Sequence, residues 1–226
     1  MMQNKIRIVS TKKLSKKQKQ TLLTVDFSVF EADFITIQNR NFDIDKTNDY
    51  LIFTSQNAVE SVLKNRNGSD IKIKKCFCVG EKTKALLEEN GFEVIEFSEY
   101  AAELASMICN QYSKNSFTFF CGNMRRDFLP AALRLVEIEL DEVEVYETIL
   151  TPHKIDFIPN GIFFFSPSGV KSYLQENKIV NENCFCIGNT TAEALKYVTP
   201  NRIIANQPTV ESTIMKCIEY YRQQND

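Results

Sequence analysis

Short apolar runs alternate along the chain with amphipathic segments of about ten residues. The runs are rich in Phe, Ile and Val, which favour strands, and the segments between them have apolar residues at helical spacing. The predicted strands are KIRIVST (5–11), FSVFEADFITI (27–37), DYLIFTS (49–55), KCFCVG (75–80), FEVIEF (92–97), SFTFFCGN (116–123), VEVYET (143–148), IFFFS (162–166), CFCIG (184–188) and RIIA (202–205). Strands that alternate with helices indicate βαβ units and parallel sheets.

The sequence contains an internal repeat. CFCVGEKT (76–83) recurs as CFCIGNTT (184–191), and YLIFTSQNAVESVL (50–63) aligns with GIFFFSPSGVKSYL (161–174). The second pair shares Phe53/Phe164, Ser55/Ser166, Val59/Val170, Ser61/Ser172 and Leu63/Leu174. Two copies in the same order predict two related α/β units.

The strand count predicts how these units are divided along the chain. Residues 34–148 supply a complete small sheet, whereas residues 161–205 supply only three strands, too few for a stable sheet of their own. The strand and helix before residue 26 lack a sheet. We therefore predict a discontinuous α/β domain, 1–36 plus 150–226, and an inserted α/β domain, 39–147. Two crossings, near 37–40 and 148–152, form a two-stranded linker.

Composition narrows the class of protein. The chain has 43% hydrophobic and 25% charged residues and a net charge of −2, which predicts a soluble globular protein without a basic field for nucleic acid. It has no apolar stretch of 18 residues and no apolar signal at its start, so we expect no membrane contact. Seven cysteines, most of them in apolar runs, suit reduced thiols in a cytoplasm.

Two cysteine pairs raise the question of a metal. Cys76 and Cys78, like Cys184 and Cys186, are two residues apart in a strand, so each pair lies on one face. Zinc would need four convergent ligands, and the single histidine, His153, stands in the predicted linker. We predict buried core cysteines and no metal. The sequence also lacks the glycine-rich motifs of dinucleotide and Walker-type sites, so no cofactor is expected.

Six segments together resemble the uroporphyrinogen-III synthase family. They are IFTSQNAVES (52–61), CFCVGEKTKALLEENGF (76–92), FFCGNMRRDFLP (119–130), VEVYET (143–148), FFFSPSGVKSYL (163–174) and CIGNTTAEAL (186–195), and they occur in the family's order. The resemblance implies two Rossmann- or flavodoxin-like domains with parallel sheets, joined by the two-stranded linker, with a cleft between them.

The resemblance also implies a reaction. A linear hydroxymethylbilane is closed to uroporphyrinogen III with loss of water and inversion of ring D, which makes the protein a cofactor-free lyase of haem biosynthesis. The implied protein is a cytoplasmic monomer that acts on a small linear tetrapyrrole and contacts the preceding pathway enzyme at most transiently. Two alternatives stay open: a two-domain small-molecule sensor without catalysis, and a Rossmann-like transferase, which the missing phosphate loop disfavours.

Several residues are candidates for binding the carboxylates of this substrate. A strand, a Gly-x-x-Thr turn and a helix place free backbone N–H groups and a hydroxyl at a helix N-terminus, which suits an anion. The candidates at such ends are Ser55, Thr83, Ser166, Ser168, Gly169, Thr190 and Thr191. The alternative interpretation is that these residues only cap their helices. Arg125 and Arg126 are further candidates, and a solvated helix start explains them equally well.

Tyr146 is the candidate catalytic residue. It lies at the return crossing and is similar in position to the family's functional tyrosine. A phenol, with an ordinary pKa of about 10, can donate a proton to a departing hydroxyl at neutral pH. The alternative is a tyrosine buried in a strand.

Overall fold

The computed structural model describes residues 5–44 and 46–224, which form two compact units. Of the described residues, those up to 36 and those from 149 onward form one unit, and those between 37 and 148 form the other. We call them the discontinuous unit and the inserted unit.

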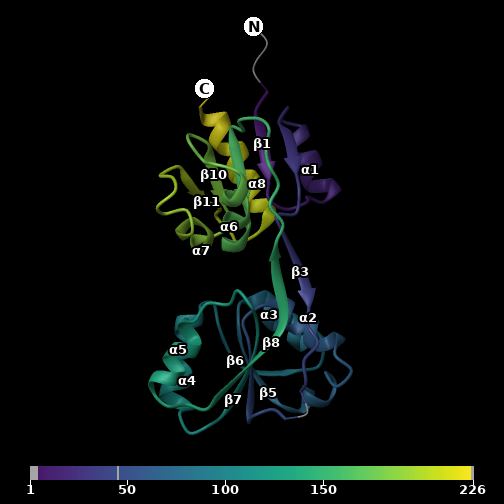
Figure 1. Cartoon of the computed structure of the whole chain (residues 1–226), viewed down its shortest axis with the longest axis vertical. Helices are drawn as coiled ribbons and strands as arrows, with labels where there is room; N and C mark the ends of the chain where they lie inside the picture. Colours follow the sequence, from purple (N-terminus) through teal and green to yellow (C-terminus); the bar gives the residue numbers. More distant parts are fainter. Residues whose placement is uncertain (1–4, 45, 225–226) are drawn as a thin grey trace. The chain divides into compact units, whose positions relative to one another are not determined.

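Two neighbouring strands, β3 (Ile35–Asn39) and β8 (Leu140–Leu150), carry the chain from one unit to the other and back (Figure 1). Arg40 N donates to Val145 O over 3.0 Å, and Thr151 N donates to Phe34 O over 3.0 Å. Residue numbers therefore rise along one strand as they fall along the other, so the ribbon is antiparallel.

The inserted unit is an α/β sheet covered on both faces. Its described strands have the order β3-β8-β7-β4-β5-β6, and the pairings from β8 to β6 are parallel. Beside β3 and β8 it contains β4 (Tyr50–Phe53), α2 (Gln56–Lys64), the 3-10 helix η1 (Asp70–Ile73), β5 (Lys75–Val79), α3 (Glu81–Glu89), β6 (Glu93–Ser98), α4 (Ala101–Gln111), β7 (Phe117–Gly122) and α5 (Phe128–Leu135). One buried cluster joins α2 and α3 to the sheet, and another joins α4 and α5 to its other face (Figure 1).

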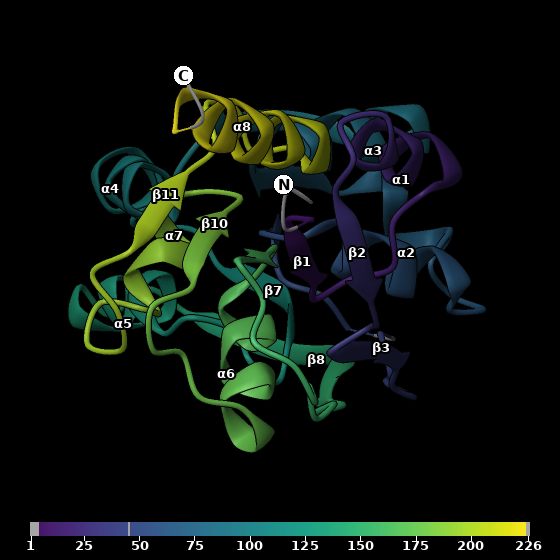
Figure 2. The ribbon, with the colours of Figure 1, turned by 90° about the horizontal axis from the view of Figure 1, so that it is seen from above.

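The discontinuous unit has the same two-sided build with a different strand order, β11-β10-β9-β1-β2, all parallel. It contains β1 (Arg7–Ser10), α1 (Lys16–Leu23), β2 (Ser28–Glu31), β9 (Gly161–Phe164), α6 (Pro167–Glu176), β10 (Asn183–Cys186), α7 (Asn189–Glu193), β11 (Arg202–Ile204) and α8 (Val210–Gln223). The strands lie between α8 and α6 in Figure 2, and buried clusters on the two faces agree with this. Counted within the unit, the order is 2-1-3-4-5, that of flavodoxin-like folds.

The sequence repeat is also a structural repeat. β4 pairs with β5 so that Phe53 faces Cys78, and β9 pairs with β10 so that Phe164 faces Cys186. The helix after the first strand of each pair, α2 or α6, begins at a serine that caps it. The predicted mixed α/β fold with parallel sheets is confirmed.

One predicted strand is wrong in its extent. Residues 27–37 were expected to be continuous, but β2 and β3 belong to different sheets. The break contains Ala32 and Phe34, both buried, and Asp33, whose carboxylate accepts the backbone N–H of Lys13 over 2.9 Å. The apolar pattern continues through the break because Ala32 and Phe34 are core residues of the discontinuous unit.

The cysteine pairs lie in the cores, as predicted. Cys76 and Cys78 pack in one cluster with α2 and α3, and Cys184 and Cys186 pack in another with α6. Burial raises the pKa of the Cys78 and Cys186 thiols to about 12 in each case. They are therefore protonated at neutral pH. Within residues 5–44 and 46–224, no helix is long and apolar enough to cross a membrane.

Candidate functional site

The inserted unit has a switch point at the carboxyl ends of β4 and β7. These neighbouring strands lead to helices on opposite faces, β4 to α2 and β7 to α5. Ligands of open α/β sheets bind in the crevice outside the strand ends at such a point. Ser55 follows β4, Gly122 ends β7, and Tyr146 lies on β8 beside Gly122.

Tyr146 lies against a glycine that leaves room for its ring. A Cβ atom at Gly122 would be 2.4 Å from Tyr146 Cζ and 2.9 Å from its hydroxyl oxygen, so any side chain there would displace the phenol. The register between β7 and β8 also shifts here, because Cys121 pairs with Glu144 while Gly122 pairs with Tyr146. Such irregularities re-aim side chains next to functional sites.

Ser55 connects the start of α2 to this tyrosine. Its Oγ accepts the backbone N–H of Ala58 over 3.2 Å, which caps the helix. The same hydroxyl donates to the phenol oxygen of Tyr146 over 3.1 Å. With its oxygen accepting from Ser55, the phenol keeps its own O–H free to donate elsewhere.

Asn123, which follows Gly122, fixes the strand on the other side of Tyr146. Its backbone N–H donates to Tyr146 O over 3.3 Å, and its side-chain oxygen accepts the N–H of Thr148 over 2.9 Å. The backbone on both sides of residue 147 is thereby held to the end of β7.

The two candidate arginines differ in their surroundings. Arg125 forms ion pairs with Glu142 and, over 3.0 Å, with Asp127, and its side chain is only 25% exposed. Arg126 is exposed, and it takes part in none of the ion pairs between described residues. Arg126 is therefore the one whose charge is available to a ligand.

The discontinuous unit has its own switch point, between β1 and β9. Ser166 Oγ accepts the N–H of Gly169 over 3.0 Å and lies 3.0 Å from Ser168 Oγ. Thr11, just after β1, donates its hydroxyl to Phe163 O over 2.8 Å, and a Cβ at Gly169 would be 3.5 Å from its Oγ1. Thr11 and the serines therefore gather at the same edge.

The two Gly-x-x-Thr turns have matching hydrogen bonds. Gly80 O accepts the N–H groups of Thr83 (2.9 Å) and Lys84 (3.1 Å), and Gly188 O accepts those of Thr191 and Ala192 (3.1 Å each). The N–H groups of the two residues between each glycine and its threonine do not take part in these bonds. They are available to other acceptors.

The threonines in these turns are less accessible than predicted for direct ligand contact. Thr83 is 5% exposed and Thr191 is 2% exposed, whereas Thr190 is exposed. Backbone N–H groups and Thr190 are therefore better placed than the two buried hydroxyls to meet an anion. The turns also differ in backbone, because Gly80 has φ +88° while Gly188 is extended, with φ −174°.

A model of the family described as uroporphyrinogen-III synthase HemD matches residues 19–215, most of the chain. The chain belongs to the uroporphyrinogen-III synthase family. This membership supports a role in tetrapyrrole biosynthesis and disfavours the alternative of a sensor without catalysis.

Two curated proteins are similar to this synthase-family chain. The porphyrin biosynthesis protein HemD of Ruminiclostridium josui is 25% identical over 193 residues, covering 75% of this chain and 38% of that protein. The chain thus matches well under half the length of that relative. The uroporphyrinogen-III synthase of Saccharomyces cerevisiae is 23% identical over 228 residues, covering 84% of this chain and 82% of that protein.

Solved structures share the fold of this uroporphyrinogen-III synthase family member. A uroporphyrinogen-III synthetase from Helicobacter pylori superposes with a TM-score of 0.70 at 20% identity, covering 95% of this chain and 99% of that one. A mutant synthase from Thermus thermophilus gives a TM-score of 0.71 at 12% identity, covering 97% and 99%.

Three residues of the candidate site were missed in the sequence. Gly122 and Asn123 stand in a quoted motif, but their contacts with β8 depend on tertiary pairing. Thr11 is a hydroxyl residue at the end of an apolar run, as Ser55 is. The same sequence signal could therefore have identified Thr11.

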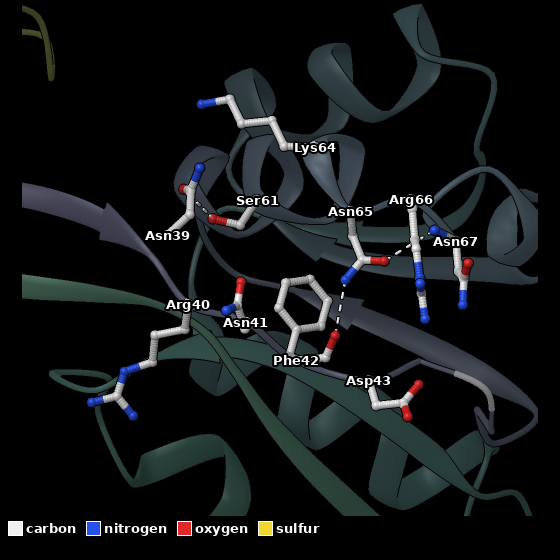
Figure 3. A pocket seen from close by; sticks show the side chains of 10 residues that line it. All are labelled: Asn39, Arg40, Asn41, Phe42, Asp43, Ser61, Lys64, Asn65, Arg66 and Asn67. Carbon is white, nitrogen blue, oxygen red and sulfur yellow. Dashed lines mark hydrogen bonds between the residues drawn. The ribbon is translucent and has the colours of Figure 1, made fainter.

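A separate polar pocket of about 650 Å³ lies at the far end of α2 from Ser55 (Figure 3). It is lined by Asn39, Arg40, Asn41, Phe42, Asp43, Ser61, Lys64, Asn65, Arg66 and Asn67, none of them a predicted site residue. Arg40 is already paired with Glu144 (2.7 Å) and Glu147 (3.4 Å). Asn65 donates to Phe42 O over 2.9 Å, so several of the polar groups are used within the fold (Figure 3).

Proposed function

We propose that this protein is a uroporphyrinogen-III synthase, a lyase that closes hydroxymethylbilane to uroporphyrinogen III with loss of water and inversion of ring D. The proposal rests on family membership and on one observation above all: a phenol held over a glycine, with its oxygen accepting from Ser55.

The first chemical step needs a proton. The C–O bond of the hydroxymethyl group, which the terminal pyrrole at the opposite end of the substrate from ring D carries, breaks, and the departing hydroxide must become water. In our proposal Tyr146 donates its O–H proton to that oxygen, leaving a phenolate and a cationic azafulvene. The hydrogen bond from Ser55 stabilises the phenolate, because bonds to a charged acceptor are stronger than those to a neutral one.

The following step requires positioning rather than a nucleophile from the protein. A substituted carbon of ring D attacks the azafulvene carbon, giving a spiro intermediate that reopens and closes with the ring inverted. Both partners of the new bond belong to the substrate, so the enzyme contributes by holding them close.

The substrate's carboxylates would be bound at the carboxyl edge of each unit. The groups that we propose for this are the hydroxyls of Ser55, Ser166, Ser168 and Thr190, the exposed Arg126, and the backbone N–H groups near Gly169, Thr83 and Thr191. Helix N-termini favour anions through their free N–H groups and dipole. A chain with net charge −2 can in this way bind a polyanion locally.

The setting that we propose is the cytoplasm, with the protein acting as a monomer and at most a transient contact with the enzyme that supplies its substrate. Seven cysteines without a disulfide are consistent with a reducing compartment.

The direct test is incubation with freshly made hydroxymethylbilane, followed by oxidation and separation of the uroporphyrin isomers. The proposal predicts isomer III in excess. Isomer I alone, which forms without an enzyme, would refute it.

A further inference from the structure

The discontinuous unit has a second concave site, on the edge of its sheet opposite to Ser166 and Thr191. A pocket of about 380 Å³ is formed by the segments 154–159 and 178–182 and by the last turn of α6. These segments precede β9 and β10, so the pocket lies at the amino ends of those strands. Its volume is in the range of small-molecule sites, about 300–1,000 Å³.

Two buried polar side chains line this pocket. Tyr173 is 1% exposed and Glu182 is 7% exposed. The hydroxyl of Tyr173 makes no hydrogen bond with the part of the chain that the structure describes. This hydroxyl is not among the described polar atoms that are both fully enclosed and without a partner, so it is accessible and can meet a partner from outside the chain.

The carboxylate of Glu182 is only half engaged. Its Oε2 accepts the backbone N–H groups of Val180 (2.6 Å) and Asn181 (2.9 Å), while Oε1 takes part in none of the hydrogen bonds between described residues. None of the ion pairs between described residues includes Glu182. Oε1 is not among the enclosed polar atoms without a partner, and neither lysine of the pocket lining, Lys154 or Lys178, forms a described ion pair with it, so this oxygen can accept from a cationic ligand.

The carboxylate acts on the phenol. Burial and the neighbouring charge of Glu182 raise the pKa of Tyr173 well above its ordinary value, so the phenol stays protonated. Its oxygen can accept a hydrogen bond from a ligand beside the carboxylate.

The remaining walls favour an organic cation. Apolar side chains surround the two polar groups: Ile155, Phe157, Ile158, Pro159 and Val180. Three negatively charged residues, Asp156, Glu176 and Glu182, and two positively charged residues, Lys154 and Lys178, line the pocket. Their formal net charge is −1. An anion such as the tetrapyrrole substrate would meet the buried carboxylate and be repelled.

We propose that this pocket binds a small organic ammonium compound, with its charged nitrogen donating to Glu182 Oε1 and Tyr173 Oη and its apolar part against Phe157 and Val180. The site is separate from the proposed active site, and its ligand has the opposite charge to the substrate.

Benzylammonium is a suitable probe, compared with benzyl alcohol and benzoate as neutral and anionic controls of similar shape. A ligand with so few atoms is expected to bind with a Kd on the order of 1 mM. In amide-detected NMR, benzylammonium should give saturable shifts centred on Val180 and Asn181. The two controls should give none at the same concentrations.

Three variants locate the binding groups. Glu182→Gln keeps an acceptor for the two backbone N–H groups and should weaken benzylammonium binding at least tenfold, and Tyr173→Phe should weaken it severalfold. Glu219→Gln, a change of an exposed carboxylate on α8 that does not line the pocket, is the matched control and should leave the Kd unchanged. Absence of a saturable shift, equal binding of benzyl alcohol or benzoate, or an unchanged Kd in folded Glu182→Gln would overturn the proposal.

Discussion

Ser55 donates its hydroxyl to the phenol oxygen of Tyr146 over 3.1 Å while it caps α2 through Ala58 N. One side chain therefore fixes both the start of a helix and the proposed proton donor on β8. The repeat separates the two roles of this serine. Ser166, its counterpart, caps α6 in the same way but lies beside Ser168 rather than a tyrosine, so only Ser55 holds a phenol.

Ser55→Ala should reduce both stability and activity. Losing the cap is expected to lower the free energy of unfolding by about 1 kcal/mol. Losing a bond to the developing phenolate, worth about 1.5–3 kcal/mol, should slow uroporphyrinogen III formation roughly 10- to 100-fold. Ser55→Thr keeps the hydroxyl and should retain most of the activity. The measurements are thermal unfolding and initial rates.

Thr209→Ala is the matched control for the cap. Thr209 accepts Ser212 N over 3.1 Å at the start of α8, far in sequence from any proposed site residue. It should lose a similar stability and keep full activity. Equal rates in Ser55→Ala and Thr209→Ala would show that the Ser55–Tyr146 bond has no part in the reaction.

Gly122→Ala should inactivate the protein through Tyr146. The added methyl would overlap the ring, which would have to leave its place. We expect a rate close to that of a variant without the phenol, with the circular dichroism of a folded protein. Gly91→Ala is the control: Gly91 has φ +85° and open space around it, so the change strains the backbone but touches no side chain. If folded Gly122→Ala is as active as Gly91→Ala, glycine is not needed to seat the tyrosine.

The matched glycines of the repeat should respond differently to alanine. Gly80 has φ +88° and ψ 131°, a conformation that side chains rarely adopt, so Gly80→Ala should cost about 1–3 kcal/mol. Gly188 is extended and has nothing within 4 Å of a Cβ, so Gly188→Ala should be neutral or slightly stabilising. Melting temperatures of the two variants test this, and equal losses would contradict the backbone difference.

The buried thiols should be unreactive in the folded protein. Burial raises the pKa of Cys121 to about 11 and those of Cys78 and Cys186 to about 12, so none is a thiolate at pH 8. Six of the seven cysteines are buried, and Cys109 is partly exposed. A thiol reagent at pH 8 should therefore label at most Cys109 quickly, and all seven after denaturation. Rapid labelling of Cys78 in folded protein would contradict the core assignment.

The sequence predicts the fold well wherever a pattern is local. The repeat of 50–63 and 161–174 predicts the paired strand–helix units. The two-residue spacing of Cys76 and Cys78 in a strand predicts that both side chains lie on the same face of the sheet. It fails at residues 32–34, where the chain leaves one sheet for another. Asp33 is the single polar residue there and no glycine marks the break, because the choice is made by pairing with β1 and by the bond of Asp33 to Lys13.

The candidate site is predictable only in part, for a related reason. Tyr146 and Ser55 stand in recognisable segments, but their contact joins residues 91 positions apart. The need for glycine at 122 arises from the Tyr146 ring above it, which no spacing in the sequence encodes. The burial of Thr83 and Thr191 is likewise a result of tertiary packing, and it moves the emphasis from their hydroxyls to backbone N–H groups.

The most direct test of the account is the rate of uroporphyrinogen III formation by Tyr146→Phe, with Tyr197→Phe, a change of a tyrosine that is 93% exposed, as the control. General acid catalysis contributes roughly 10²- to 10⁴-fold, so Tyr146→Phe should lose that much activity with an unchanged melting temperature, while Tyr197→Phe stays fully active. A folded Tyr146→Phe variant that forms uroporphyrinogen III at the unmodified protein's rate would contradict the proposed role of Tyr146.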